Sequence, residues 1–216
     1  KKTYRIVFVI LAFIGIMINA FFSGANPIMM LSYYTIQSNL ACLILMVIIL
    51  IREHNHKPLT PMIVQVKAAF TPMIFLTFLV YHLLLRPVMI AYETEYDVLG
   101  YSDLLVHYVV PLMMLLDFVL FDCPIALKKT TPLKWIAIPG IYWVYTVIYA
   151  LLGGRYVIGE SVSRYPYFFM DFEELGFWMA VGLISVVAMG YIGIGYGLFG
   201  INQLGWKLTN CEKRDY

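Results

Sequence analysis

Six apolar runs follow one another along this chain, and each is close to the length that a helix needs to cross a lipid bilayer. That length is roughly 20 residues, because a helix rises about 1.5 Å per residue. Backbone groups in hydrocarbon must hydrogen-bond to one another, and the alternating pattern of membrane β-strands is absent, so we expect helices. The sequence therefore predicts an all-α membrane bundle in which residues 1–216 form a single six-span domain. The runs cover residues 4–22, 31–51, 67–88, 102–121, 133–153 and 175–199.

The composition agrees with burial in lipid. Hydrophobic residues make up 62% of the chain and charged residues 13%, whereas a soluble domain carries about 25% charged residues. The first run starts close to Lys1 and Lys2 and lacks a small-residue cleavage site, so we expect a retained anchor. The three cysteines form no C-x-x-C pair. Gly-rich phosphate loops and nucleic-acid-binding signatures are absent, and we predict neither a cofactor nor a nucleic-acid partner.

Lysine and arginine residues are distributed unevenly over the connections between the runs. Cytoplasmic loops of membrane proteins carry an excess of these residues. With the N-terminus in the cytoplasm, twelve fall on the cytoplasmic side and three outside, so both termini are predicted to be cytoplasmic. The short external loops and the lack of a eukaryotic targeting signal favour a bacterial plasma membrane. The cytoplasmic set is Lys1, Lys2, Arg5, Arg52, Lys57, Lys67, Lys128, Lys129, Lys134, Lys207, Lys213 and Arg214, and the external set is Arg86, Arg155 and Arg164.

Polar residues mark one face of the second run. Thr35, Ser38, Asn39 and Cys42 are spaced at i, i+3, i+4 and i+7, which places all four on the same side of a helix. Threonines in membrane helices usually bond back to a carbonyl one turn earlier, and Ser38 and Asn39 are residues that commonly join helices. A packing role is therefore the structural alternative for each of them.

Ionisable residues occur in the third and fourth runs. His82 and Arg86 are four residues apart at the end of the third run. Asp103 and His107 are also four apart at the start of the fourth, and Asp117 lies deeper in it. Such residues are costly in a membrane and are candidates for function, although a histidine can be structural, Arg86 can reach the headgroups and Asp117 can be a hydrogen-bonding hub. The predicted directions of the spans bring Thr35, His82, Arg86, Asp103 and His107 into one layer in the outer half of the bilayer.

Two chemistries fit this layer. A weak hydroxyl nucleophile needs a base within hydrogen-bonding distance, and that base needs a third group to orient it. Thr35, His107 and either Asp103 or Asp117 fill these roles. The alternative is a zinc site formed by His82, His107 and Asp103. It ranks lower because no H-E-x-x-H motif or comparable ligand spacing is present, and we predict no metal.

Three short stretches resemble a known family. The stretches Tyr33–Asn39, His107–Pro111 with the following Asp117, and Arg164–Phe168 are similar to signature segments of the androgen-induced gene family. The resemblance implies six spans and hydrolysis of fatty acid esters of hydroxy fatty acids by a threonine and a histidine. These two residues correspond to Thr35 and His107. The Gln37-Ser38-Asn39 sequence is more similar to a bacterial branch of the family than to its animal enzymes.

We therefore predict an intramembrane lipid-ester hydrolase with Thr35 as nucleophile and His107 as general base. Its partners are membrane lipids or a lipid-ester substrate. Candidate oxyanion donors are His82, Ser38 and Asn39, and Arg86 is a candidate ligand for a substrate carboxylate.

Tyr142, Tyr145, Thr146 and Tyr149 line an acyl channel or pack between helices. The alternatives are a lipid-binding or transport protein without chemistry, and a scaffold that has lost its activity.

Overall fold

In the computed structural model, the described residues are those outside 93–99, 123–124, 126, 159–160 and 209–216. The helices in chain order are α1 (Lys2–Met17), the π-helix η1 (Ile18–Phe22), α2 (Pro27–Ser32), α3 (Tyr34–His54), α4 (Pro61–Val80), the π-helix η2 (Tyr81–Leu85), α5 (Arg86–Tyr92), α6 (Tyr101–Leu104), the π-helix η3 (Leu105–Val109), α7 (Val110–Phe121), α8 (Thr131–Trp135), α9 (Ala137–Leu151), the 3₁₀ helix η4 (Phe168–Met170), α10 (Phe172–Leu175) and α11 (Phe177–Leu208). A short antiparallel hairpin joins β1 (Tyr156–Ile158) to β2 (Ser161–Ser163).

The all-α prediction is confirmed, and the membrane prediction is confirmed in part. Within the part of the chain that the structure describes, four helices are long and apolar enough to cross a membrane, which indicates an integral membrane protein: Lys2–Phe22, Tyr34–His54, Pro61–Ala91 and Phe177–Gly205. They correspond to the first, second, third and sixth predicted runs. The fourth run contains a shorter apolar helix, Leu105–Phe121.

The fifth predicted run, 133–153, is divided into α8 and α9. Pro139 lies in the first turn of α9 and lacks an N–H, and its ring opposes the carbonyl four residues earlier. That carbonyl belongs to Trp135, where α8 ends. Neither part therefore reaches the length of a spanning helix by itself.

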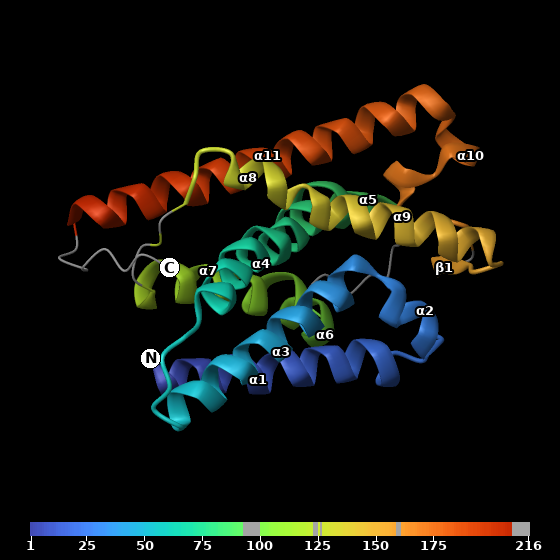
Figure 1. Ribbon diagram of the computed structural model, residues 1–216. Coiled ribbons are helices and arrows are strands. Elements are labelled where there is room, and N and C mark those ends of the chain that lie inside the picture. The colour runs from blue at the N-terminus through green and yellow to red at the C-terminus, as the bar shows by residue number, and fades with distance from the viewer. Residues whose placement is uncertain (93–99, 123–124, 126, 159–160, 209–216) are drawn as a thin grey trace.

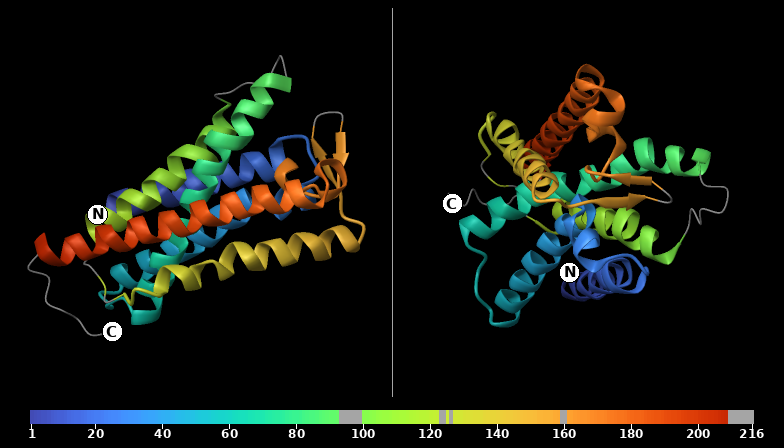
Figure 2. Two further views of the ribbon diagram at one scale, coloured as in Figure 1. Left: turned by 90° about the horizontal axis from the view of Figure 1, so that it is seen from above. Right: turned by 90° about the vertical axis from the view of Figure 1, so that its right-hand side faces the viewer.

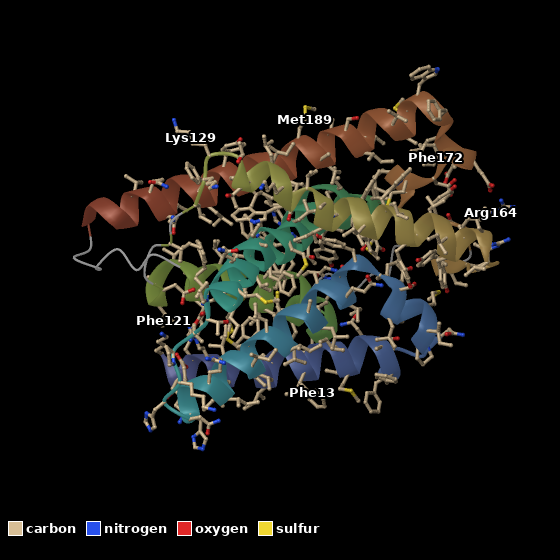
Figure 3. All side chains as sticks on the ribbon, viewed as in Figure 1. Phe13, Phe121, Lys129, Arg164, Phe172 and Met189 are labelled. Atoms are coloured by element: carbon tan, nitrogen blue, oxygen red, sulfur yellow. The ribbon has the colours of Figure 1, made fainter. Side chains whose placement is uncertain are left out.

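The helices pack in three layers. α1 and α3 pack together on one side, α4 and α7 pack together in the middle, and α9 and α11 lie on the other side (Figure 1). α4 also contacts both α3 and α11, so it is the central helix of the bundle. Phe13 on α1 and Met189 on α11 point outward on opposite sides (Figure 3) and are 55% and 63% exposed. Large apolar side chains on the outside of a bundle are suited to contact with lipid.

One end of the bundle carries the hairpin, η4 and α10, and we call it the hairpin end (Figure 2). Asp171 connects β2 to the start of α10. Its carboxylate accepts from the backbone N–H of Glu173 and of Glu174, at the start of α10, and from the hydroxyl of Ser163 at 2.6 Å. The hairpin was not predicted from the sequence, and it lies in the loop between the fifth and sixth predicted runs.

The opposite end contains a buried ion network. Arg5 forms two hydrogen bonds with Asp117, Nε–Oδ1 at 2.8 Å and Nη2–Oδ2 at 2.9 Å, and contacts Glu53 at 2.7 Å. Lys67 forms ion pairs with Asp117 and Asp122. Arg5 and Lys67 were predicted to belong to the charged cytoplasmic set, yet their side chains are 0% and 1% exposed. The network joins α1, α3, α4 and α7, and it neutralises charges that would be costly if buried alone.

Candidate active site at the hairpin end

The second predicted run is interrupted just before Thr35. Tyr33 is extended, with φ −70° and ψ 140°, and separates α2 from α3. The hydroxyl of Tyr142 on α9 bridges this break, because it accepts from the Tyr34 N–H at 3.0 Å and donates to the Ser32 carbonyl at 3.2 Å. Thr35 therefore lies in the first turn of α3, at the point where the chain enters the bundle.

Three π-helices surround the site. η1 ends the first helix and η2 and η3 interrupt helices at the hairpin end, and all three line the same cavity: η1 with Asn19, η2 with Tyr81 and Leu85, and η3 with His107. A π-helical turn is wider than an α-helical one and frequently occurs at functional sites. The apolar runs of the sequence did not predict these widened turns.

The structure brings Thr35 and His107 together. The Thr35 Oγ1 lies 3.3 Å from the His107 Nε2, close to the roughly 2.6–3.2 Å of a nucleophile and its base. The His107 Nδ1 lies 3.2 Å from the backbone carbonyl of Asp103, which can only accept a hydrogen bond. Nδ1 therefore carries the proton of the neutral ring, and Nε2 is left to accept the proton of Thr35.

Asp103 and Tyr81 hold the imidazole from two sides. The Asp103 Oδ1 lies 3.6 Å from the His107 Nδ1. The ring of Tyr81 stacks on that of His107, and its hydroxyl donates to the Asp103 Oδ2 at 3.2 Å. Of the two carboxylates proposed as the orienting group, the structure brings Asp103 to the histidine.

Asp117 is not part of this group. It lies ten residues beyond His107, which corresponds to about 15 Å along a helix. Its carboxylate is occupied by Arg5 and Lys67 in the buried ion network. The proposed role of Asp117 in orienting His107 is therefore corrected to an ion-pairing role at the far end of the bundle.

Ser38 and Asn39 fix the position of Thr35 through its backbone. The Ser38 hydroxyl donates to the Thr35 carbonyl at 3.0 Å and contacts the Thr77 Oγ1 at 3.0 Å. The Asn39 Nδ2 donates to the same carbonyl at 2.8 Å and to the Val106 carbonyl at 3.0 Å. Neither residue lines the two cavities beside Thr35, and the donors of both are bound to backbone carbonyls.

Tyr167 is a site residue that the sequence analysis did not single out. It belongs to the stretch Arg164–Phe168, is buried, and lines both cavities at the site together with Thr35. Burial raises the pKa of the Tyr167 hydroxyl, so this group stays protonated and can donate a hydrogen bond. Its place in a loop between two predicted spans gave no indication that it would enter the bundle.

Two cavities meet at Thr35, and Tyr167 and Leu85 also line both. The first has a volume of about 280 Å³ and is lined mainly by apolar side chains, most of them from α4, α9 and α11. The second has a volume of about 350 Å³ and includes the polar residues Asn19, Asp103 and His107. We call them the apolar cavity and the polar cavity. Tyr142 lines the apolar cavity, whereas Tyr145, Thr146 and Tyr149 line neither.

His82 and Arg86 are not brought to Thr35. His82 is exposed, with its Nδ1 3.1 Å from the hydroxyl of Tyr108. Arg86 lines neither cavity, and its buried Nε has no hydrogen-bond partner among the residues that the structure describes. Within the same residues, no group of three or more histidine, cysteine, aspartate or glutamate side chains is arranged to hold a metal ion. His82, His107 and Asp103 therefore do not form the alternative zinc site.

Comparisons of the chain with protein-family models, with curated proteins and with solved structures give no match. The resemblance to the androgen-induced gene family therefore stays a prediction. In the site itself, the hydroxyl of Thr35 contacts the imidazole of His107, and the carboxylate of Asp103 lies behind the imidazole. These groups lie where the apolar cavity and the polar cavity meet.

Proposed function

We propose that this protein is an intramembrane hydrolase of lipid esters, with Thr35 as nucleophile and His107 as general base. The observation that carries the proposal is the 3.3 Å contact between the Thr35 Oγ1 and the His107 Nε2, with Asp103 behind the imidazole. A threonine that served only for packing would not need an oriented imidazole at its hydroxyl. The resemblance to hydrolases of fatty acid esters of hydroxy fatty acids points to the same chemistry.

The reaction proceeds in two steps. The Thr35 oxygen attacks the ester carbonyl while His107 takes its proton, and the tetrahedral intermediate expels the alcohol, which receives that proton from His107. The fatty acyl group is then bound to Thr35 as an ester. Water, deprotonated by His107, attacks this ester, and the proton returns to the Thr35 oxygen as the free acid leaves.

The negative charge of each tetrahedral intermediate needs a donor. Tyr167 is the candidate supported by the site, because it is buried, lines both cavities together with Thr35, and keeps its hydroxyl protonated. The imidazolium formed in each step is stabilised by the carboxylate of Asp103 at 3.6 Å. No outside ion is required for either role.

The protein would sit in the membrane with six spans and with both termini in the cytoplasm, as the distribution of lysine and arginine favours. Four of the six spans would be the helices of sufficient length. The other two would be the helical segment Tyr101–Phe121 and the pair α8–α9. The hairpin end would then face outward and place Thr35 in the outer half of the bilayer. An amphiphilic ester could reach it with its carbonyl near the headgroups.

The test is hydrolysis of a panel of lipid esters by the purified protein in detergent, together with Thr35→Ala, His107→Ala and His82→Ala. We expect the first two variants to lose at least about a hundredfold in rate, as removal of a nucleophile or general base does. His82→Ala is the matched control, because this exposed histidine is bonded to Tyr108 and not to the site. Covalent labelling of Thr35 by a fluorophosphonate probe would identify the nucleophile directly.

A lipid-binding protein without chemistry is the second candidate, and the apolar cavity favours it. It predicts binding of lipid esters without turnover and equal binding by wild type and Thr35→Ala. Turnover that Thr35→Ala and His107→Ala leave unchanged would reject the threonine mechanism.

A further inference from the structure

We infer that the two cavities separate the two halves of the ester: the fatty acyl chain occupies the apolar cavity, which it enters sideways from the bilayer between α9 and α11, and the alcohol occupies the polar cavity. This inference rests on the proposed function, because it assigns the substrate halves around Thr35. Three observations support it: the position of His107, the lining of each cavity and the divergence of α9 from α11.

The position of His107 determines which half lies where. The group that takes the proton of the nucleophile must later give it to the leaving alcohol, so the alcohol oxygen has to lie on the side of His107. His107 and Asp103 line the polar cavity and not the apolar one. The acyl chain, on the other side of the carbonyl, is then directed toward the apolar cavity.

The lining of the apolar cavity suits an alkyl chain. Its surface is almost entirely carbon, from residues such as Leu76, Val80, Phe169 and Val187. Burying methylene groups against such a surface is favourable, whereas an unpaired polar headgroup there would be costly. A fatty acyl chain is therefore the occupant that fits the cavity.

We place the entrance to the apolar cavity between α9 and α11. α8 packs against α11, and α9 diverges from α11 toward the hairpin end (Figure 1, Figure 2). Both helices line the cavity, α9 with Gly140 and Trp143 and α11 with Ala188, and Trp143 is 40% exposed. A chain already dissolved in the bilayer can pass between these helices without crossing water.

Three substitutions test the assignment in the active protein. Ala188→Phe fills part of the apolar cavity, Ala25→Phe fills part of the polar cavity, and Gly190→Phe adds the same ring on the exposed face of α11, where an added Cβ meets nothing within 4 Å. The measurement is kcat/KM for two series of esters. One extends the acyl chain from butanoyl to hexadecanoyl, and the other extends the alcohol.

We expect Ala188→Phe to lower kcat/KM for hexadecanoyl esters by about tenfold relative to butanoyl esters, because several methylene groups lose their contacts. The alcohol series should be affected by Ala25→Phe instead, and Gly190→Phe should match wild type. If Ala188→Phe changed the alcohol series, or if neither series responded, the assignment would be overturned.

A binding measurement separates this inference from the hydrolase proposal. Hexadecanoic acid with a photoreactive diazirine at its far end is added to Thr35→Ala protein, and the labelled residues are identified by mass spectrometry. Label on Trp143, Val187 or Ala188, lost in the double variant with Ala188→Phe, supports the acyl assignment even if no ester is hydrolysed. Label on residues of the polar cavity, or only on outward-facing residues such as Met189, overturns it even if hydrolysis is observed.

Discussion

The phenol ring of Tyr81 lies flat on the imidazole of His107, with ring centroids 3.8 Å apart and planes 12° apart, while its hydroxyl donates to Asp103. The two rings come from different π-helices, η2 and η3. Tyr81 thus contacts both the imidazole and the carboxylate behind it. In the proposed mechanism Tyr81 is a positioning residue, because the atoms that face Thr35 belong to His107.

Substitution of Tyr81 should separate stacking from hydrogen bonding. Tyr81→Phe keeps the stacked ring and loses only the bond to Asp103, so we expect kcat to fall about fivefold, equivalent to about 1 kcal/mol. Tyr81→Leu removes both contacts and should lower kcat further, with little change in KM, because the base and not the substrate is disturbed. Equal kcat values for the two variants would show that the stacking does not orient His107.

Asp103→Asn should reduce catalysis without abolishing it. The amide keeps the size of the side chain but removes the charge 3.6 Å from the His107 Nδ1. The backbone carbonyl of Asp103 still holds the imidazole at 3.2 Å. We therefore expect a loss of about tenfold in kcat, or about 1.4 kcal/mol, measured with the best ester of the panel. An unchanged kcat would assign stabilisation of the imidazolium to another group.

Asp117→Asn should destabilise the fold. The amide cannot form the ion pairs that the Asp117 carboxylate forms with Arg5 and Lys67. Removing one member of a buried ion network lowers the free energy of unfolding by about 3–5 kcal/mol. We expect a clearly lower Tm in detergent, with kcat of the remaining folded protein close to that of wild type.

Lys1→Met is the control for Asp117→Asn. The Lys1 side chain is 43% exposed and pairs with Glu53 at 3.3 Å, so its loss should cost less than about 1 kcal/mol. A stable but inactive Asp117→Asn protein would instead return Asp117 to the active site.

Gly15→Val tests the approach of α1 to the π-helix that carries His107. A Cβ at Gly15 would lie 3.0 Å from atoms of both Leu105 and Val106, so a larger side chain must displace η3. We expect a loss of about 1–3 kcal/mol in stability and reduced kcat, because His107 moves with η3. Gly182→Val is the comparison, since an added Cβ there meets nothing within 4 Å. Thermal unfolding and ester hydrolysis of both variants would be measured side by side.

The sequence by itself determined what depends on distance along the chain. The apolar runs predicted an all-helical protein, and among the described residues four of them form helices of spanning length. The spacing of Asp103 and His107 placed them on one helical face, and the order of the runs put Thr35 and His107 at a similar depth. These inferences depend only on the rise of a helix, its period and hydropathy.

Only the tertiary structure decided what depends on the azimuth of each helix and on its neighbours. It placed Thr35 beside His107, which is 72 residues away in the sequence. It paired Asp117 with Arg5 and Lys67, and it buried the loop residue Tyr167 in the bundle. Hydropathy is a one-dimensional quantity and cannot tell which of two carboxylates will meet a given imidazole. That choice follows from the side-chain packing that sets the rotation of the helices, including the widened turns of η2 and η3.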